Sequence, residues 1–202
     1  MKIDFRKEYK DLYTASATRP VIVDVPELSF LMVDGVGDPN TSPDYQGAVE
    51  ALYGLSYWLK FAVKKGEGGV DYAVMPLEGL WWTEDMAKFS PDRKDIWQWT
   101  AMIMQPEYVT PSLFQEALTQ VAKKKNPPLL SKVRFSRFHE GLCAQVMFIG
   151  PYAAEGPTIE MLHGFINTQG RRLRGKHHEI YLGDPRRSAP EKLKTIIRQP
   201  VS

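Results

Sequence analysis

The chain has 202 residues, of which 43% are hydrophobic and 25% charged, and its formal net charge is +2. These values are typical of a globular protein with one domain, or with two small modules that share a core, and they do not predict disorder. A net charge this small does not indicate a nucleic-acid partner, and no stretch approaches the roughly 20 apolar residues of a membrane span.

The cysteine content and the N-terminus both favour a reducing compartment. The single cysteine, Cys143, rules out an internal disulfide and lies in the apolar run 142–149, where a buried, inert thiol is expected rather than a nucleophile. The first residues lack an apolar segment of signal-peptide length. We therefore expect a soluble, cytoplasmic protein.

The first half of the chain predicts strands around one long helix. After a polar arm with a short helix near residues 6–13, two β-rich runs, 21–25 and 28–36, predict two strands or one bent strand around Pro26. Ser42 and Pro43 then supply an N-cap and a first-turn proline for a helix that ends near Gly66.

The same half continues with two further strands and a second helix. The strands are expected at 72–82 and 96–104, and the polar connection 83–95 between them is a candidate lid. Thr110 and Pro111 begin the second helix, which runs into residues 123–128, the candidate linker between modules.

The second half follows the same plan. Residues 133–138 and 142–149 predict a hairpin around His139, Glu140 and Gly141, and Pro157 begins a helix that stops at Gly170. Strands follow at 177–182 and 193–199. Ser188 and Glu191 match the spacing of a capping box, but the repeat favours a strand from Leu193.

The repeat is visible in two passages of matching order. Residues 75–82, which contain Glu78, are closed by Gln105-Pro106, and residues 177–182, which contain Glu179, are closed by Gln199-Pro200. We therefore predict an α+β fold for a single domain, 1–202. Its two strand–helix–strand–strand modules, about 20–125 and 131–202, are expected in pseudo-two-fold relation, with helices on one face of a curved antiparallel sheet.

The two glutamates are the candidate catalytic residues. Since strand residues two apart share a face, Glu179 shares one with His177 and Tyr181, while Ile180 and Leu182 suit the helix-covered face. The glutamate face is then expected to be the open, concave one. Burial in an apolar cleft would raise the pKa of either glutamate and prepare it to accept a proton. Otherwise the carboxylates attract a cationic ligand, are solvated or form ion pairs.

Aromatic side chains are the candidate ligand contacts. Trp97 and Trp99 share a strand face and predict a stacking platform for a planar ligand, although four tryptophans within 81–99 also suit a core. Trp82 shares a face with Glu78. We expect these contacts to come from the following residues: Trp82, Trp97, Trp99, Tyr152 and His177.

No motif predicts a metal or a cofactor. His177 and His178 are adjacent on a strand and point to opposite faces, and no zinc-type spacing, P-loop or dinucleotide fingerprint is present. The basic segment 171–176 is typical of a solvated loop more than of a phosphate contact.

The duplicated plan, with Pro76–Trp82 in the first half and His177–Arg187 in the second, resembles the GyrI-like small-molecule-binding superfamily over roughly residues 21–201. This group includes gyrase-inhibitory proteins and the drug-binding domains of multidrug-responsive activators. The chain looks like the free-standing branch that lacks a DNA-binding domain. The strand glutamate of the ligand cleft in that superfamily matches Glu179.

Some members of that branch are cyclopropanoid cyclopropyl hydrolases, which detoxify DNA-alkylating natural products by adding water to a strained ring. The resemblance therefore implies a hydrolase in which Glu179 or Glu78 activates a water and Tyr181 contacts a carbonyl of the ligand. A non-catalytic drug-binding protein, or a regulator of gyrase, is the alternative. The expected partner is a planar hydrophobic small molecule, and the expected state is a monomer or homodimer.

Overall fold

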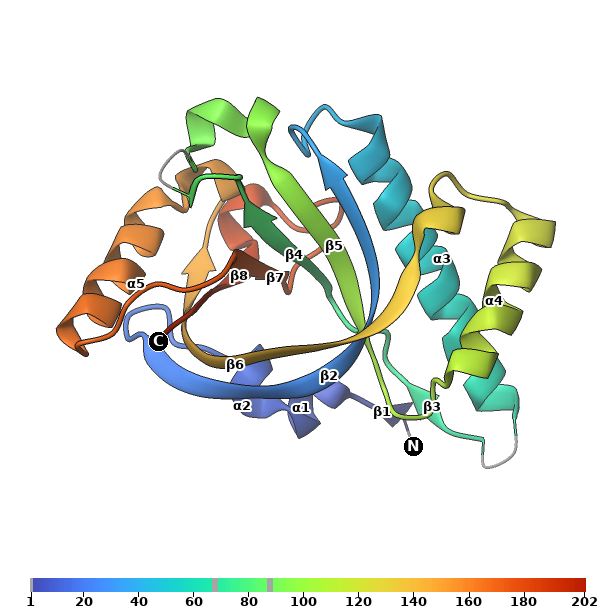
Figure 1. Ribbon diagram of the computed structural model, residues 1–202. Coiled ribbons are helices and arrows are strands. Elements are labelled where there is room, and N and C mark those ends of the chain that lie inside the picture. Colours follow the sequence, from blue (N-terminus) through green and yellow to red (C-terminus); the bar gives the residue numbers. More distant parts are fainter. Residues whose placement is uncertain (1, 67–68, 87–88) are drawn as a thin grey trace. The chain divides into compact units, whose positions relative to one another are not determined.

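The computed structural model describes residues 2–66, 69–86 and 89–202 and has a mixed α+β fold (Figure 1). The helices are α1 (Phe5–Glu8), α2 (Lys10–Tyr13), α3 (Pro43–Lys65), α4 (Pro111–Lys124) and α5 (Gly156–Thr168). The strands are β1 (Lys2–Ile3), β2 (Val21–Val36), β3 (Asp71–Tyr72), β4 (Leu77–Trp82), β5 (Gln98–Gln105), β6 (Arg134–Ile149), β7 (His177–Tyr181) and β8 (Lys194–Pro200).

The two longest helices begin where the sequence predicts them. Ser42 Oγ accepts a hydrogen bond from the Tyr45 amide at 3.2 Å, and Thr110 Oγ1 accepts one from the Leu113 amide at 3.2 Å. Each cap satisfies an amide that the first helical turn leaves unpaired, and a proline follows each cap. The apolar stripe of α3 is buried, including Leu52, Leu55 and Leu59.

The chain divides into two compact units, each built from two stretches of sequence. The first comprises the residues up to Phe5 and Leu28–Phe138, and the second comprises Arg6–Glu27 and His139–Ser202. The expected modules, 20–125 and 131–202, have different boundaries from these units. The reason is that β2 and β6, each 16 residues long, contribute residues to both units.

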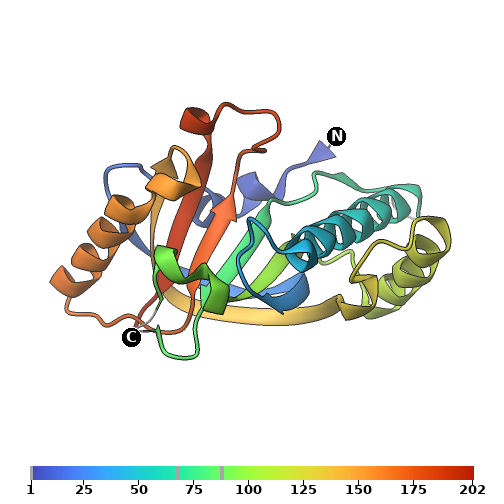
Figure 2. The same ribbon diagram turned by 90° about the horizontal axis from the view of Figure 1, so that it is seen from above.

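In the first unit, an antiparallel sheet runs in the order β2–β5–β4. Ser29 pairs with Gln105 on β5, and Leu77 pairs with Ile103. Helix α3 covers one face of this sheet, because Gln105 Nε2 donates to Ser56 Oγ of α3 at 3.1 Å. Helix α4 lies along α3 (Figures 1 and 2).

In the second unit, the antiparallel order is β6–β8–β7, with Val146 opposite Ile197 and Ile197 opposite Glu179. Helix α5 lies beside these strands (Figure 2) and buries Leu162 and Ile166 against Val146 and Ile197. The strand predicted from Leu193 is confirmed as β8, which follows a short 3-10 helix at Pro190–Lys192.

The hairpin expected around residues 139–141 is wrong, because β6 runs without reversal from Arg134 to Ile149. Gly141 adopts a φ of +73°, which glycine allows at no steric cost, and the chain changes conformation there without turning back. The carbonyl of Glu140 accepts from Arg174 Nη2 at 2.7 Å. A long strand with a local irregularity therefore replaces the expected turn.

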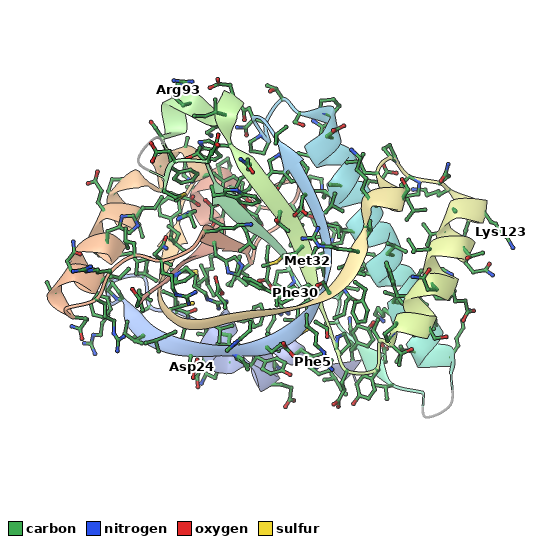
Figure 3. All side chains as sticks on the ribbon, viewed as in Figure 1. Phe5, Asp24, Phe30, Met32, Arg93 and Lys123 are labelled. Carbon is green, nitrogen blue, oxygen red and sulfur yellow. The ribbon has the colours of Figure 1, made fainter. Side chains whose placement is uncertain are left out.

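The connection between β4 and β5 is only partly described. The candidate lid, 83–95, includes residues 87–88, which lie outside the described residues, and its end forms a 3-10 helix at Pro91–Ile96. Arg93 in this segment and Lys123 on α4 are exposed (Figure 3). Within the described ranges, no helix is long and apolar enough to cross a membrane.

Candidate functional site

Glu179 lies on the sheet face that α5 covers. Residues directly opposite each other in an antiparallel ladder share a face, and Glu179 is opposite Ile197, which packs against α5. His177 and Tyr181, two residues away on β7, share that face. Ile180 lies on the other face. The expectation that Glu179 faces an open side while Ile180 faces the helix is therefore wrong.

In the first unit, Glu78 lies on the sheet face that helix α3 does not cover. It is opposite Met102, whereas α3 covers the face that carries Gln105 and Trp99. The Glu78 side chain is only 1% exposed, among buried residues such as Met102 and Leu80. Trp82 shares this face, as predicted, and is half-buried. Glu78 therefore lies on the face away from the helix, as expected of the glutamate face, but the residue is buried there.

The ladders show that the two glutamates are not equivalent positions. If Gln105 corresponds to Gln199, then Ile103 corresponds to Ile197, and the strand partner of Ile103 is Leu77. Leu77, and not Glu78, is therefore the counterpart of Glu179, whose partner is Ile197. An error of one residue moves a side chain to the opposite face of a sheet. Pairing Glu78 with Glu179 by sequence order is therefore off by one residue.

Three side chains of β7 form one hydrogen-bonded row. Tyr181 Oη donates to Glu179 Oε2 at 2.7 Å, and His177 Nε2 lies 3.0 Å from Glu179 Oε1. The side chains of Glu179 and His177 are 13% and 4% exposed. An ionised carboxylate only accepts hydrogen bonds, so His177 carries its proton on Nε2 in this contact. The row fixes the orientations of His177 and Tyr181.

The charge of Glu179 follows from these contacts. Burial by itself raises the pKa of this carboxyl, but the hydrogen bond from His177, the charge of His177 and the hydrogen bond from Tyr181 outweigh it, and the pKa lies below its usual value. The surroundings of Glu179 are thus polar, and the rise in pKa that an apolar cleft would cause does not occur. Glu179 is an anion at neutral pH. It can orient its two neighbours and attract positive charge, but it is a weak proton acceptor.

Further aromatic and polar groups lie on the same face. The Tyr152 ring, 38% exposed, packs edge-on against Tyr181 with centroids 5.4 Å apart. Thr195 of β8 is directly opposite Tyr181, and its buried Oγ1 has no hydrogen-bond partner among the described residues. On α5, the charge of His177 acts on His163. The structure thus brings together Glu179, Tyr181, His177 and Tyr152 of the predicted site residues.

The opposite face of this sheet holds a second, buried polar cluster. His178 Nδ1 lies 2.9 Å from Glu140 Oε1, and Arg198 Nη1 lies 3.4 Å from Glu140 Oε2. Arg198 also donates to Gln145 Oε1 and to the Leu12 carbonyl. Burial alone raises the pKa of Glu140, but His178 and Arg198 lower it below its usual value. This cluster ties the N-terminal segment to the sheet.

The predicted stacking platform is part of the core of the first unit. Trp99 is 0% exposed, and Tyr45 of α3 packs edge-on against its ring at 5.0 Å. Its ring lies over Gly35, where a Cβ would come within 2.2 Å of the indole. Trp97 is 9% exposed, stacks on Phe89 and donates to the Ser90 carbonyl. Trp99 therefore presents no open surface, whereas ligand contacts by Trp97 and Trp82 stay predictions.

Cys143 is not suited to act as a nucleophile. Cys143 is buried, and that burial raises the pKa of its thiol. Across residues 2–66, 69–86 and 89–202, no group of three His, Cys, Asp or Glu side chains is arranged to hold a metal ion.

Sequence reasoning missed His163 and Thr195. His163 follows Ile159 by four residues and precedes Ile166 by three, so the helical spacing places it next to the inward stripe. That spacing was the available signal. Thr195 had none, because a threonine in an apolar strand is ordinary.

A family model described as a GyrI-like small molecule binding domain matches residues 18–202, and the chain belongs to this family. No curated protein sequence matches the chain significantly.

Three solved structures from Listeria innocua are similar along their whole length, each covering 100% of both chains. An uncharacterized conserved protein is 45% identical with a TM-score of 0.92. Two hydrolases are 44% and 41% identical, with TM-scores of 0.90 and 0.87.

Proposed function

We propose that this protein binds planar, largely apolar small molecules and hydrolyses them, opening the cyclopropane ring of DNA-alkylating compounds by addition of water. The observation that carries the proposal is the Tyr181–Glu179–His177 row, in which one anion holds a histidine and a phenol in fixed orientation. The family and the two hydrolases from Listeria innocua at 44% and 41% identity support it.

The row suits this chemistry in two ways. Addition of water to a cyclopropane conjugated to a carbonyl needs a proton acceptor near the water and stabilisation of the negative charge that develops on the carbonyl oxygen. Glu179 fixes the orientation of His177 and Tyr181, the two groups of the row that can donate a proton toward that oxygen, and Tyr152 offers an exposed aromatic surface beside Tyr181. The proposed product would be inert toward DNA, which makes the reaction a detoxification.

The change Glu179→Gln tests this function, because it keeps the shape of the side chain and removes its charge. The protein is incubated with excess cyclopropane-bearing alkylator, and the product that carries one added water is followed by mass spectrometry. We expect the rate to fall about 10²–10⁴-fold, the usual contribution of a positioned acid or base system. Glu116→Gln, at an exposed position of α4, is the matched control and should leave the rate unchanged.

A second candidate function is non-catalytic binding, either to sequester drugs or to regulate a partner such as gyrase. It is favoured by the low pKa of Glu179, since a permanent anion beside aromatic rings suits an organic cation. Protection of the alkylator in only stoichiometric amounts, without hydrated product, would select this function and end the hydrolase proposal. In that case Glu179→Gln should weaken the binding of a cationic dye.

A further inference from the structure

The proposed addition of water requires a group that takes a proton, and Glu179 is poorly placed for that task. Both of its carboxylate oxygens already accept hydrogen bonds, Oε1 from His177 and Oε2 from Tyr181. A proton acceptor has to come within hydrogen-bond reach of the proton that it removes. Since the pKa of Glu179 also lies below its usual value, a nitrogen base on the same face is better suited to take the proton.

His163 supplies an imidazole on the helix that covers this face. It lies on α5 between Ile159 and Ile166, whose side chains pack on the sheet. Its Nε2 atom is buried and has no hydrogen-bond partner among the described residues. Buried polar atoms in native proteins are nearly always paired with protein, water or ligand, so the Nε2 atom is available to a water or a ligand.

The surroundings keep the imidazole of His163 neutral. Burial, followed by the positive charge of His177, lowers the pKa of His163 below its usual value of 6.5. The titratable groups that β7 presents on this face are His177, Glu179 and Tyr181, and Glu160 precedes His163 by one turn on α5. The α5-facing positions of β6 and β8 are otherwise apolar or uncharged. A neutral ring has a nitrogen lone pair available for a proton.

We propose that His163 is a second catalytic residue of the β7 site and accepts the proton of the attacking water, while Glu179 acts as a positioning residue for His177 and Tyr181. This inference rests on the proposed function.

The proposed step balances as follows for a cyclopropane conjugated to a dienone. The water oxygen bonds to the ring methylene carbon, and the carbon–carbon bond of the cyclopropane breaks. The electron pair of that bond moves through the dienone to the carbonyl oxygen, which becomes a phenolate. The water proton passes to His163 Nε2 and from there to solvent, and the phenolate takes up a proton from solvent. No oxidant or reductant is needed.

The change His163→Gln tests the role, since glutamine keeps a hydrogen-bonding group and cannot act as a base. We expect hydrated product to form about 10²–10⁴-fold more slowly, with little change in the melting temperature. The wild-type rate should fall as the pH drops through the pKa of His163, below 6.5, and the residual rate of the variant should lack that limb. His139→Gln, the same change at an exposed position of β6, is the control.

Nuclear magnetic resonance of the wild-type protein decides the question even if the variant does not fold. The chain has only 4 histidines, so ring signals are few. The signal of His163 should titrate below pH 6.5 and shift more than that of His139 when the dienone compound is added.

Different results distinguish a wrong role for His163 from a wrong proposed function. Product formation by wild type and by His163→Gln at equal rates would overturn the role of His163 and leave the hydrolase intact. An absence of hydrated product with wild type would overturn both, and a His163 signal that does not respond to the compound would remove His163 from the site altogether.

Discussion

Glu179 and Glu140 lie in the same unit, and both have lost much of their hydration. In each, burial acts to raise the pKa of the carboxyl, and the positive charges and hydrogen bonds of neighbouring side chains reverse that effect. The two residues differ in access. Glu140 is 3% exposed and closed in by Arg198 and His178, whereas the row at Glu179 adjoins the exposed ring of Tyr152. The same balance of forces thus acts at one closed position and at one position beside exposed aromatic surface.

Thr195 allows a test of what a buried hydroxyl without a hydrogen-bond partner costs. Its hydroxyl is fully buried and has no partner among the described residues, so Thr195→Val removes a desolvated polar group and keeps the shape. We expect the free energy of unfolding to rise by about 1 kcal/mol, measured by urea denaturation. Thr100→Val is the control and should lower stability, because Thr100 Oγ1 donates to Asp34 at 2.6 Å. A loss of stability in Thr195→Val would show that the hydroxyl is paired in solution.

At the scale of elements, caps and apolar spacing predicted the helices because those signals are local. Ser42-Pro43 and Thr110-Pro111 each set a helix start within the residues that the sequence shows together. The path of β6 and the faces of Glu78 and Glu179 depend on pairing with distant strands, which single-sequence patterns do not contain. A period of two then turns a one-residue error into the wrong face, as it did for Glu179.

The tryptophans of the first sheet allow a test of an element's packing. Trp99 is fully buried under Tyr45, so Trp99→Ala should lower the free energy of unfolding by about 3–5 kcal/mol. Trp82→Ala, at a half-buried position on the opposite face, should cost clearly less. Thermal and urea denaturation measure both. A Trp99→Ala protein of wild-type stability that has lost ligand binding would restore the stacking role that the sequence suggested.

At the scale of the whole molecule, stability should depend on acid through the Glu140 cluster. The folded pKa of Glu140 is lowered from 4.5, so its contribution is present above that pH and is lost as the pH falls below it. Glu140→Gln should cost about 3–5 kcal/mol at neutral pH, because Arg198 stays buried without its anion.

The Glu140→Gln protein should also lose less stability than wild type as the pH falls below about 4.5, which denaturation at several pH values measures. Asp184→Asn is the control. The Asp184 carboxylate pairs with Arg186 at the surface, where the partner is 84% exposed, and such pairs contribute little. A steep acid transition that persists in Glu140→Gln would assign the effect to other carboxylates.

The hydrogen bond from Arg198 to the Leu12 carbonyl joins residues 186 positions apart, and it has a consequence for synthesis on the ribosome. The segment Arg6–Glu27 is synthesised long before β8, the strand that completes its unit. At roughly 5–20 residues per second, that segment waits on the order of ten to forty seconds for its partners. During this interval its apolar residues are open to chaperones and to neighbouring nascent chains. A protein truncated before Arg198 would lack the guanidinium that donates to the Leu12 carbonyl, so this segment would stay without that partner.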